Sequence, residues 1–556
     1  MGFMTHTNAS TPIKYLFRFR DLIAPTLVEH QKVIDRNGAC WWGWWKRPSE
    51  GPREDVWKAL ASEASESTPV RVGLFDSGSG QVHAAWVTQV IEPVCQIDAS
   101  PALPEGEGGL VPEYYRTSPF SRAWMRLTGI DTEPLNFFGH FSFVAVPRLP
   151  YYSEAVLNRL QDKVIKSPDE LRGMDTTIWR IRPRVEGDSD KEIILTIHSL
   201  SDPVSAESVD LGSNTILHIT DPHYAVGKGR DKHVWTLEGE TRRSKPTLAE
   251  AIKGAINNRS IGMVLVTGDL TFTGDQREFE EARTSLFRLL GLLQLDVDRL
   301  VVIPGNHDIR WTKLETYEED SVVTEAPEEA KANYREFYFK LFRHKANPTL
   351  SMGRRFLLPS GIALEICAVN SSSLAQGQDF LAGMGRIEES AFEGVANALD
   401  WKKEALSFRI LALHHHLMLT ENLEPVTGYG RGFGIAIDAT RITRMAARYG
   451  VHLAIHGHKH RAFLWRSGVY ELPEHAQPTW QLGDLSLIGG GSAGSSETEG
   501  QNNYFNLLQI DNSGLRVEMY RANRGGIFQQ MSTWTAGLRI DGDPPRLVLS
   551  AWSKKS

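Results

Sequence analysis

The chain has 556 residues, of which 41% are apolar and 23% charged, and its net charge is −7. This composition excludes a wholly disordered chain, a collagen-like repeat and a coiled-coil rod. At about 100–200 residues per domain, the length predicts two to four domains. The acidic balance argues against a broad nucleic-acid-binding surface.

The three cysteines, Cys40, Cys95 and Cys367, are odd in number and far apart in the sequence. A disulfide framework or a cysteine-based zinc site is therefore not expected, and a reducing, cytoplasmic location is predicted. Because no run of about 18 apolar residues occurs, the sequence predicts neither a membrane-spanning helix nor a membrane partner.

Residues 1–205 are predicted to form a Trp-rich N-terminal domain, either β-rich or α+β, with a barrel as one option. This region holds eight of the fifteen tryptophans, four of them in the run 40–45. Alternation of apolar and polar residues predicts strands here, and a short helix is expected over 26–35. The predicted strands cover residues 15–20, 40–45, 70–75, 82–90 and 141–146.

The tryptophans leave two interpretations open. They fill the core of a small barrel, or they line an aromatic pocket that stacks a base or a nucleotide. A pocket for one base needs no broad basic face, so the acidic composition does not exclude it. In either case the domain is interpreted as a specificity or regulatory module.

The domain boundary is expected near residues 201–211, after an apolar run over 193–197 that predicts a strand. A second domain is predicted over 213–530, and residues 531–556 are interpreted as a C-terminal tail or final strand. Short apolar runs alternate with helical patterns over 247–257 and 279–293, which predicts an α/β layered domain. Its predicted strands cover 215–219, 263–266, 300–303, 362–369, 410–413 and 451–455.

Asp, Asn and His residues follow five of these strands. In open α/β sheets, ligands bind beyond the carboxyl ends of the strands, so five loops can deliver these side chains to one place. Each motif alone has a plain structural interpretation as a helix cap or a turn, but the ordered set is not expected by chance. The motifs are Asp221-Pro222-His223, Gly268-Asp269, Gly305-Asn306-His307-Asp308, His414-His415-His416 and Gly457-His458-Lys459-His460.

The candidate ligands combine imidazole, carboxylate and amide groups without thiolate. Such a set suits Mn, Fe, Zn or Co rather than a structural zinc held by cysteines. Two aspartates and four histidines are too many for one metal with open positions. We therefore predict two metals with a bridging carboxylate, an arrangement that stabilises in-line displacement at phosphorus.

The ordered set of motifs resembles the calcineurin-like metallophosphoesterase superfamily over about residues 213–530. Within that superfamily, the run 266–271 and the histidine cluster after residues 411–413 are most similar to the class III cyclic-nucleotide phosphodiesterase branch. The resemblance implies a four-layer α/β/β/α sandwich. It also implies two metal ions, with Asp269 and a hydroxide bridging them.

The resemblance further implies a role for each motif residue. Family members often carry His-His-Pro at the fifth motif, whereas this chain has His414-His415-His416-Leu417, so His415 stays open as an alternative ligand to His414. His307 would protonate or stabilise the leaving oxygen, and Asp308 would orient His307. The first metal would be held by Asp221, His223 and His460, and the second by Asn306, His414 and His458.

The function expected from the resemblance is hydrolysis of phosphodiester bonds in a nucleotide-type substrate, by in-line attack of the metal-bridging hydroxide. One alternative is a phosphomonoesterase or protein phosphatase, for which Arg310, Lys459 and Arg461 are candidate extra cations. Another is a nuclease recruited by the N-terminal domain, and a scaffold protein with a dead site is a third. Composition predicts that residues 379–386, 428–434 and 489–500 are flexible loops that could cover the site. The sequence leaves the oligomeric state open.

Overall fold

The structure is a computed structural model that carries side chains, and the chain divides into two compact units. Unit 1 comprises residues 1–198 and 238–242, and unit 2 comprises residues 199–237 and 243–556. The predicted strand over 193–197 lies outside the described residues. The structure describes all residues except 1–11, 22–23, 46–49, 51–52, 94–100, 118–122, 146–157, 175, 192–202, 239, 241–244, 311–325, 375–382, 402–405, 419–433, 472–480, 543–544 and 556.

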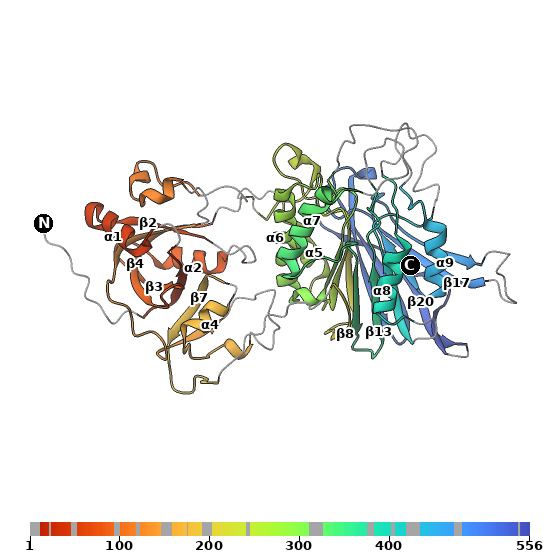
Figure 1. Ribbon diagram of the computed structural model, residues 1–556, viewed down its shortest axis with the longest axis horizontal. Helices are drawn as coiled ribbons and strands as arrows, with labels where there is room; N and C mark the ends of the chain where they lie inside the picture. Colours follow the sequence, from red (N-terminus) through yellow and green to blue (C-terminus); the bar gives the residue numbers. More distant parts are fainter. Residues whose placement is uncertain are drawn as a thin grey trace. The chain divides into compact units, whose positions relative to one another are not determined.

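Unit 1 is built on a seven-stranded sheet with the order β2-β5-β4-β3-β1-β7-β6 (Figure 1). The helices α1 (Thr26–Asn37), α2 (Glu54–Glu63) and α4 (Pro168–Gly173) accompany it. The expectation of a β-rich N-terminal domain is confirmed. The strands are β1 (Tyr15–Phe19), β2 (Cys40–Trp44), β3 (Val70–Asp76), β4 (Val82–Ile91), β5 (Ala123–Ile130), β6 (Phe141–Ala145) and β7 (Ile178–Pro183).

The sheet of unit 1 curls until its β2 edge faces β1 and the start of β7. Three strands separate β2 from β1 in the hydrogen-bonding order. Nevertheless, the rings of Phe19 and Trp42 lie 5.3 Å apart, and the Trp44 indole donates a hydrogen bond to Thr177 Oγ1 at 2.7 Å. Trp41, Trp57 and Trp179 are fully buried, and Trp42 and Trp44 are nearly so, which supports the core-filling interpretation for these five tryptophans.

Unit 2 contains two large sheets. The first has the order β11-β10-β9-β18-β19-β20-β21, with β22 paired to β20, and the second has the order β16-β17-β15-β14-β13-β12-β8. In the first sheet, β9 (Thr215–Ile219), β10 (Met263–Thr267) and β11 (Leu300–Ile303) are parallel neighbours. It continues through β18 (Asn502–Asp511), β19 (Gly514–Asn523), β20 (Gln529–Asp541), β21 (Arg546–Leu549) and β22 (Ser553–Lys555).

The second sheet has a parallel centre of β13, β14, β15 and β17. The helices α8 (Glu389–Ala398) and α9 (Ala439–Arg448) share one apolar cluster with alternate residues of β13 and β14, so they cover one face of this sheet. The strands are β8 (Val204–Asp210), β12 (Met352–Leu357), β13 (Ala363–Ala368), β14 (Ser407–Ala412), β15 (Leu453–His456), β16 (Ala462–Tyr470) and β17 (Gln481–Gly490).

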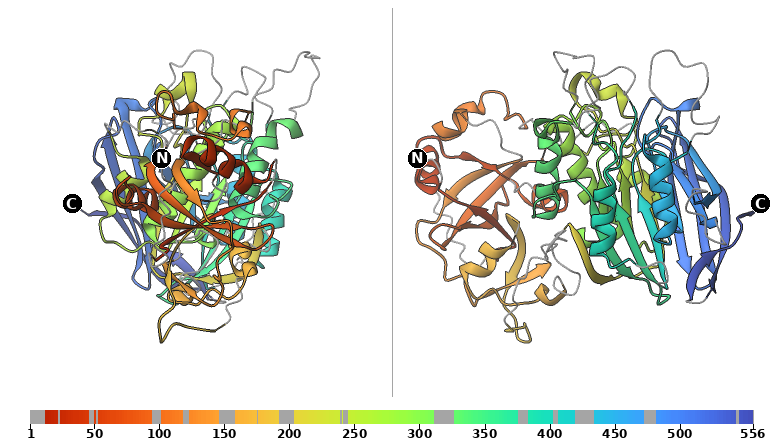
Figure 2. Two further views of the ribbon diagram at one scale, coloured as in Figure 1. Left: turned by 90° about the vertical axis from the view of Figure 1, so that its left-hand side faces the viewer. Right: turned by 45° about the vertical axis from the view of Figure 1, so that its right-hand side comes forward.

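A second layer of helices, α5 (Leu248–Ile256), α6 (Gln276–Leu293) and α7 (Glu328–Phe342), lies on the other side of unit 2 (Figures 1 and 2). Helix α5 begins where Thr247 and Glu250 form a reciprocal capping box, which satisfies two otherwise unpaired backbone N–H groups. The predicted α/β sandwich is confirmed. None of the described helices is long and apolar enough to cross a bilayer.

The predicted flexible loop over 489–500 is wrong in its first half. Residues 489 and 490 belong to β17, and residues 491–495 are buried. Ala493 N donates to Thr220 O at 2.8 Å, and the Ser492 hydroxyl donates to Asp221 O at 2.7 Å. Small residues are used here because close packing demands them: a Cβ on Gly494 would lie 2.2 Å from Pro222 O. Composition alone cannot separate this use from flexibility.

Candidate metal centre

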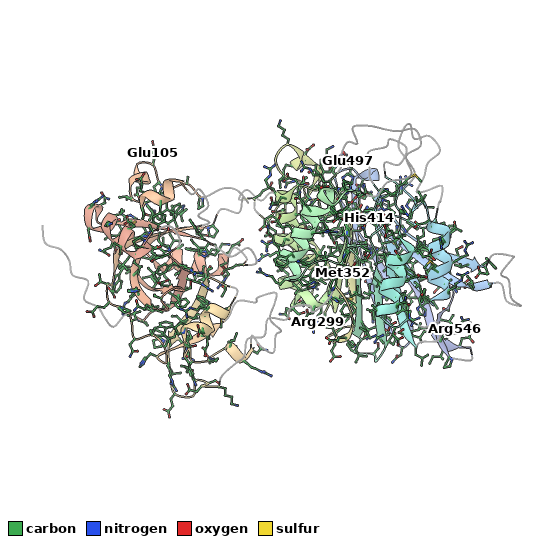
Figure 3. The ribbon with its side chains drawn as sticks, viewed as in Figure 1. Glu105, Arg299, Met352, His414, Glu497 and Arg546 are labelled. Atoms are coloured by element: carbon green, nitrogen blue, oxygen red, sulfur yellow. The ribbon has the colours of Figure 1, made fainter. Side chains whose placement is uncertain are left out.

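The carboxyl ends of five strands carry the motif residues. Asp221 follows β9, Asp269 follows β10, and Asn306 follows β11 in the first sheet. His414 follows β14 and His458 follows β15 in the second. Figure 3 shows His414 toward one end of unit 2, whereas Arg299, at the amino end of β11, lies toward the other. The two sheets therefore contribute to one edge of the sandwich, as the strand-end rule predicts.

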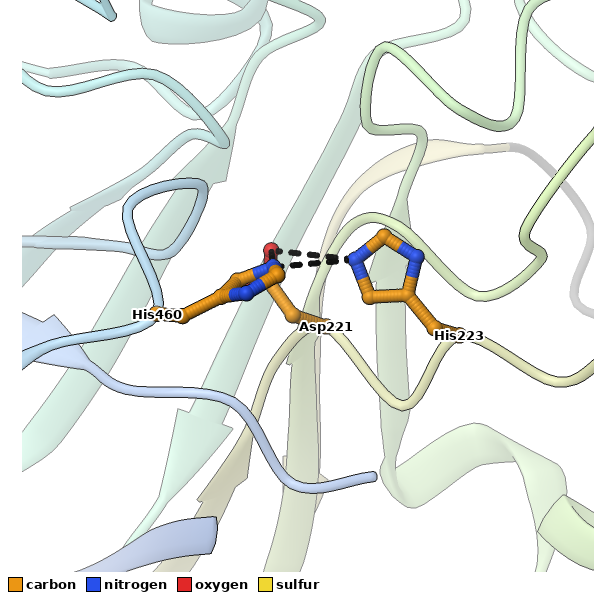
Figure 4. Close-up of side chains that lie close together, drawn as sticks. All are labelled: Asp221, His223 and His460. Atoms are coloured by element: carbon orange, nitrogen blue, oxygen red, sulfur yellow. Dashed lines mark hydrogen bonds and ion pairs between the residues drawn. The ribbon is translucent and has the colours of Figure 1, made fainter. Parts of the chain in front are cut away.

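One group of candidate ligands consists of Asp221, His223 and His460 (Figure 4). The Nε2 atoms of the two histidines lie 3.0 Å apart, and Asp221 Oδ1 is 3.3 Å from that of His460 and 3.8 Å from that of His223. His460 Nδ1 donates to Glu497 O at 2.8 Å. A neutral His460 therefore presents an unprotonated Nε2 to the group, which is the form that binds a metal.

A second group consists of Asn306, His414 and His458. Asn306 Oδ1 lies 3.1 Å from His414 Nε2 and 3.0 Å from His458 Nδ1. The His414 Nδ1–H group donates to Thr267 O at 2.8 Å, so a neutral His414 also turns an unprotonated Nε2 toward its neighbours. Asn306 and His414 are buried, and His458 is half-buried.

Asp269 lies between the two groups. Its Oδ2 atom is 3.5 Å from His223 Nε2 and 3.2 Å from His414 Nε2. Its Oδ1 atom accepts a hydrogen bond from the backbone N–H of His307 at 2.8 Å, which fixes the carboxylate. The Asp269 carboxylate therefore lies within 3.5 Å of one member of each group.

The structure places His414 and His415 differently. His414 faces Asp269 and Asn306, whereas His415 Nδ1 lies 2.9 Å from the hydroxyl of Ser371. Ser371 Oγ already accepts the backbone N–H groups of His414 and His415, so the Ser371 hydroxyl donates its own hydrogen bond to His415 Nδ1. This geometry favours His414 over His415 as the ligand.

The Asp308 carboxylate accepts the backbone N–H groups of Leu270, Thr271 and Gly305. The His307 ring donates from Nδ1 to Phe272 O at 2.7 Å. Asp308 thus joins the loop after β10, which holds the His307 ring through Phe272 O, to the loop after β11, which carries His307. The orienting role of Asp308 toward His307 stays a prediction.

The backbone around the centre is unusual. Asp221, His223, Asp269, His458 and His460 all have positive φ, between 47° and 74°. Non-glycine residues rarely adopt this conformation, and it persists where the surrounding structure imposes it, typically at functional sites. Two glycines allow close approach to the carboxylates: a Cβ on Gly305 would lie 2.1 Å from an oxygen of Asp269, and one on Gly457 2.2 Å from an oxygen of Asp221.

The electrostatics of the centre favour positive charge. Burial alone would raise the pKa of Asp269, but the nearby charges of His414 and His307 outweigh it and hold that pKa well below its usual range. Burial would lower the pKa of His414, yet the Asp269 carboxylate raises it to about 9. Burial, and then the charge of Asp269, raise the pKa of Asp308 to about 7.

These residues fit a metal. The side chains of three overlapping groups, Asp221/His223/His460, His223/Asp269/His307 and Asp269/His414/His458, bring ligand atoms within 4.8 Å of one another. In their neutral forms His414 and His460 carry an unprotonated Nε2, because each donates Nδ1–H to a backbone carbonyl, and the buried carboxylates call for a compensating cation. The mixed nitrogen and oxygen donors suit borderline divalent ions.

The sequence analysis missed the partners that hold these ligands. They are the carbonyl oxygens of Thr267, Phe272 and Glu497 and the hydroxyls of Ser371 and Ser492. Backbone carbonyls carry no sequence signal. The two serines lie in ordinary Ser/Gly-containing runs that give no sign of their role.

The three candidate extra cations are placed unequally. Lys459 is next to His458 in the sequence. The pKa of His458 is lowered mostly by burial, then by the charges of the neighbouring histidines, and then by the charge of Lys459. A Cβ on Gly434 would lie 2.1 Å from Lys459 Cε, so this lysine packs against Gly434. Arg310 is exposed and Arg461 is half-buried.

Comparison with known proteins gives two family matches. Residues 15–192 match the family described as Pua-like, and residues 214–462 match the family described as calcineurin-like phosphoesterase. No curated protein matches the chain.

Solved structures give only distant likenesses. Vps29 from Chaetomium thermophilum is 12% identical, covers 61% of this chain and 93% of its own, and has a TM-score of 0.24. A predicted phosphoesterase from Streptococcus pneumoniae is 12% identical over 57% of this chain and 96% of its own, with a TM-score of 0.21. NAD nucleotidase from Haemophilus influenzae is 13% identical over 62% and 53%, with a TM-score of 0.22. Likenesses this low say nothing about activity.

Proposed function

Since residues 214–462 belong to the calcineurin-like phosphoesterase family and make the chain a metal-dependent phosphoesterase, we propose that it hydrolyses phosphodiester bonds of a nucleotide-type substrate at a dinuclear centre. The observation that carries this proposal is the position of Asp269. Its Oδ2 atom lies within 3.5 Å of His223 and 3.2 Å of His414, one member of each ligand group. A carboxylate so placed can bridge two ions.

In this proposal each ligand group holds one divalent ion of the Mn, Fe, Zn or Co class, and Asp269 is shared. When bound, such ions supply Lewis-acid stabilisation of charge on phosphoryl oxygens and acidify water. The first ion is assigned to Asp221, His223 and His460, and the second to Asn306, His414 and His458.

His307 is assigned the proton transfer to the leaving oxygen. Its Nδ1–H group is engaged by Phe272 O, so exchange of a proton with a substrate would use Nε2. The ring is half-buried and lies 4.8 Å from the ring of His223, which places it beside the first ligand group. Asp308 is assigned a positioning role through the loop backbone.

The cations beside the centre bear on the choice between a diester, which carries one negative charge, and a monoester, which carries up to two. Lys459 adjoins His458 and acts on its pKa, half-buried Arg461 adjoins His460, and Arg310 is exposed. We assign the diester, and the monoester is the alternative that the comparison of two substrates separates.

The test is hydrolysis of bis-p-nitrophenyl phosphate and p-nitrophenyl phosphate by metal-stripped full-length protein, with Mn, Fe, Zn, Co or Mg added back. We expect metal-dependent cleavage that favours the diester, and loss of both metal and activity in Asp269→Asn. Asp484→Asn is the matched control, because the described contacts of this surface carboxylate are an ion pair with Arg466 and a hydrogen bond from Gln481. A monoester preference, or a fully loaded and active Asp269→Asn protein, would contradict the proposal.

A cytoplasmic site of action remains a prediction. It is supported by Cys40 and Cys367, which are unpaired and buried. Burial raises the pKa of both thiols, so neither is prone to oxidation.

A further inference from the structure

The His307 ring at the candidate metal centre contacts two other rings. His307 is half-buried, so packed protein does not surround it on all sides. The His223 ring meets it nearly edge-on, at a centroid distance of 4.8 Å and an interplanar angle of 77°. The Phe272 ring lies almost parallel to it, at 5.8 Å and 25°. Phe272 is the ring of the three that can neither bind a metal nor transfer a proton.

Phe272 restrains His307 through two separate contacts. Its carbonyl oxygen accepts the Nδ1–H group of His307 at 2.7 Å. This bond fixes the place of Nδ1 but leaves the imidazole free to turn about the line from Nδ1 to the oxygen. The nearly parallel Phe272 ring limits that turn, because a rotated imidazole would lose the offset-stacked contact. One residue thus constrains both the position of the His307 ring and its plane.

The Phe272 ring is itself held by other parts of unit 2. The backbone N–H of Phe272 donates to Tyr224 O at 3.1 Å. Lys232 Nζ lies 5.7 Å from the centre of the Phe272 ring, which is a cation–π contact. Lys232 is in turn paired with Glu497, at 2.6 Å. The position of the Phe272 ring therefore does not depend on His307 alone.

The plane of the His307 ring matters for the proton transfer assigned to it. In the form that donates, both ring nitrogens carry a proton, and Phe272 O binds the Nδ1 proton. As the bond from phosphorus to the leaving oxygen breaks, the Nε2 proton passes to that oxygen, and the neutral ring keeps its hydrogen bond to Phe272 O. Such a transfer requires hydrogen-bond geometry, so an imidazole free to turn would direct Nε2 away from the leaving oxygen for part of the time.

We propose that Phe272 is a positioning residue whose ring fixes the plane of the His307 imidazole, so that Nε2 points at the leaving oxygen. This inference rests on the proposed function, in which His307 donates that proton. The expected signature is a loss confined to the step that needs the proton. The loss should therefore fall on kcat rather than KM, and it should be larger for a weakly acidic leaving group than for an acidic one.

The activity test uses the full-length protein loaded with Mn²⁺ and two diesters, methyl p-nitrophenyl phosphate and methyl phenyl phosphate. Phenol is a weaker acid than p-nitrophenol, so its departure depends more on a proton donor. Phe272→Leu keeps an apolar side chain but removes the flat ring. We expect it to lower kcat for the phenyl ester about tenfold and kcat for the nitrophenyl ester less, with KM and metal content unchanged. Phe272→Tyr, which keeps the ring, should restore most of the loss.

A double-mutant cycle separates positioning from a direct role of Phe272. If Phe272 acts through His307, Phe272→Leu should lower kcat no further in a protein that already carries His307→Asn. Phe287→Leu is the matched control, because Phe287 is also half-buried in unit 2 and also lies beside a cation, with Arg283 Cζ 5.3 Å from its ring centre. This variant should keep the kcat and KM of the wild type.

A second measurement needs neither metal nor turnover. In metal-stripped protein with isotope-labelled histidine side chains, the stacked Phe272 ring should shift the nuclear magnetic resonance signal of the His307 imidazole through its ring current. The signal is identified by its absence in His307→Asn. We expect Phe272→Leu to remove the shift, and Phe272→Tyr and Phe287→Leu to keep it.

Four results would each overturn the proposal. Phe272→Leu could keep kcat for the phenyl ester, lose the same factor with both esters, lower kcat further on top of His307→Asn, or leave the His307 signal unshifted. Failure of the proposed function has a different mark: His307→Asn would be as active as the wild type on both esters, or the wild type would prefer a monoester, whatever Phe272→Leu does to the His307 signal.

Discussion

Ser371 and His415 form a buried hydroxyl–imidazole pair at 2.9 Å, one residue beyond the candidate ligand His414. The same hydroxyl oxygen accepts the backbone N–H of His414 at 3.1 Å. The His415 ring, so fixed, lies 4.5 Å from the ring of His458. A single serine thus orients the backbone of one candidate ligand and, through His415, packs against another.

The first prediction follows from that pair. Ser371→Ala removes the hydroxyl oxygen that accepts the backbone N–H of His414. Metal affinity should therefore fall about 10–100-fold, as is usual when a residue that hydrogen-bonds to a metal ligand is removed. Equilibrium dialysis with Mn²⁺ measures the change. Ser373→Ala is the control, because that hydroxyl donates to Arg386 O and touches no candidate ligand. Unchanged Mn²⁺ affinity in Ser371→Ala would remove the assigned positioning role.

The second prediction concerns His307. His307→Asn deletes the imidazole that would exchange a proton with the leaving group, so kcat should fall about 10²–10⁴-fold. Metal content, measured by mass spectrometry of the purified protein, should stay as in the wild type, because His307 is assigned to neither ion. Loss of metal in this variant would instead make His307 a ligand.

The third prediction concerns Gly305. A Cβ at this position would lie 2.1 Å from an oxygen of Asp269. Gly305→Ala should therefore displace the shared carboxylate and abolish metal binding, read out by dialysis. Gly254→Ala is the control: a Cβ added at Gly254 in α5 would meet no atom of another part of the protein within 4 Å, so its replacement should stabilise the helix by about 1 kcal/mol. Full metal loading of Gly305→Ala would show that the carboxylate has room to move.

The fourth prediction concerns the pH dependence of unit 1. Burial lowers the pKa of His30 from 6.5 to about 4. His30 is therefore neutral in the folded unit at a pH where the unfolded chain binds a proton. Stability should be complete above pH 6.5, fall as the pH drops toward 4, and then level off, with a total loss of about 3 kcal/mol.

Hydrogen exchange of the α1 and β2 amides against pH measures this effect locally. His30→Gln should remove the dependence, because glutamine does not titrate. The control, His140→Gln, replaces an exposed histidine of the same unit and should leave the dependence intact. A flat profile for the wild type between pH 4 and 6.5 would show that His30 does not titrate with unfolding.

The strands and helices of unit 2 could be predicted because their signals are local. The pattern over 247–257 predicts a helix, and the structure has α5 at Leu248–Ile256, flanked by the Thr247 cap. Likewise, the five strand-end motifs could be predicted to meet because parallel strands share one edge. Asp308 shows the limit: the sequence does not reveal that its carboxylate accepts backbone N–H groups of Leu270 and Gly305 from the loops after β10 and β11.

The rest depends on contacts between distant residues. The contacts of Ser371 with His414 and of Ser492 with Asp221 leave no local pattern, since they join residues 43 and 271 positions apart. The curl of the unit 1 sheet could not be predicted from the sequence either. Even the order of hydrogen-bonded strands does not show that the ring of Phe19 in β1 contacts the ring of Trp42 in β2. In both cases a non-local packing arrangement, rather than propensity, decides the outcome.

The hydrogen bond from Ser492 to the carbonyl of Asp221 spans 271 residues of sequence. At about 5–20 residues per second, a ribosome produces Ser492 some 14–54 s after Asp221. The Asp221 turn therefore spends that interval without its final support, although its strand is already made. A complete and supported ligand set therefore exists only after Ser492 has been made, so metal uptake follows synthesis of the strands that carry the ligands.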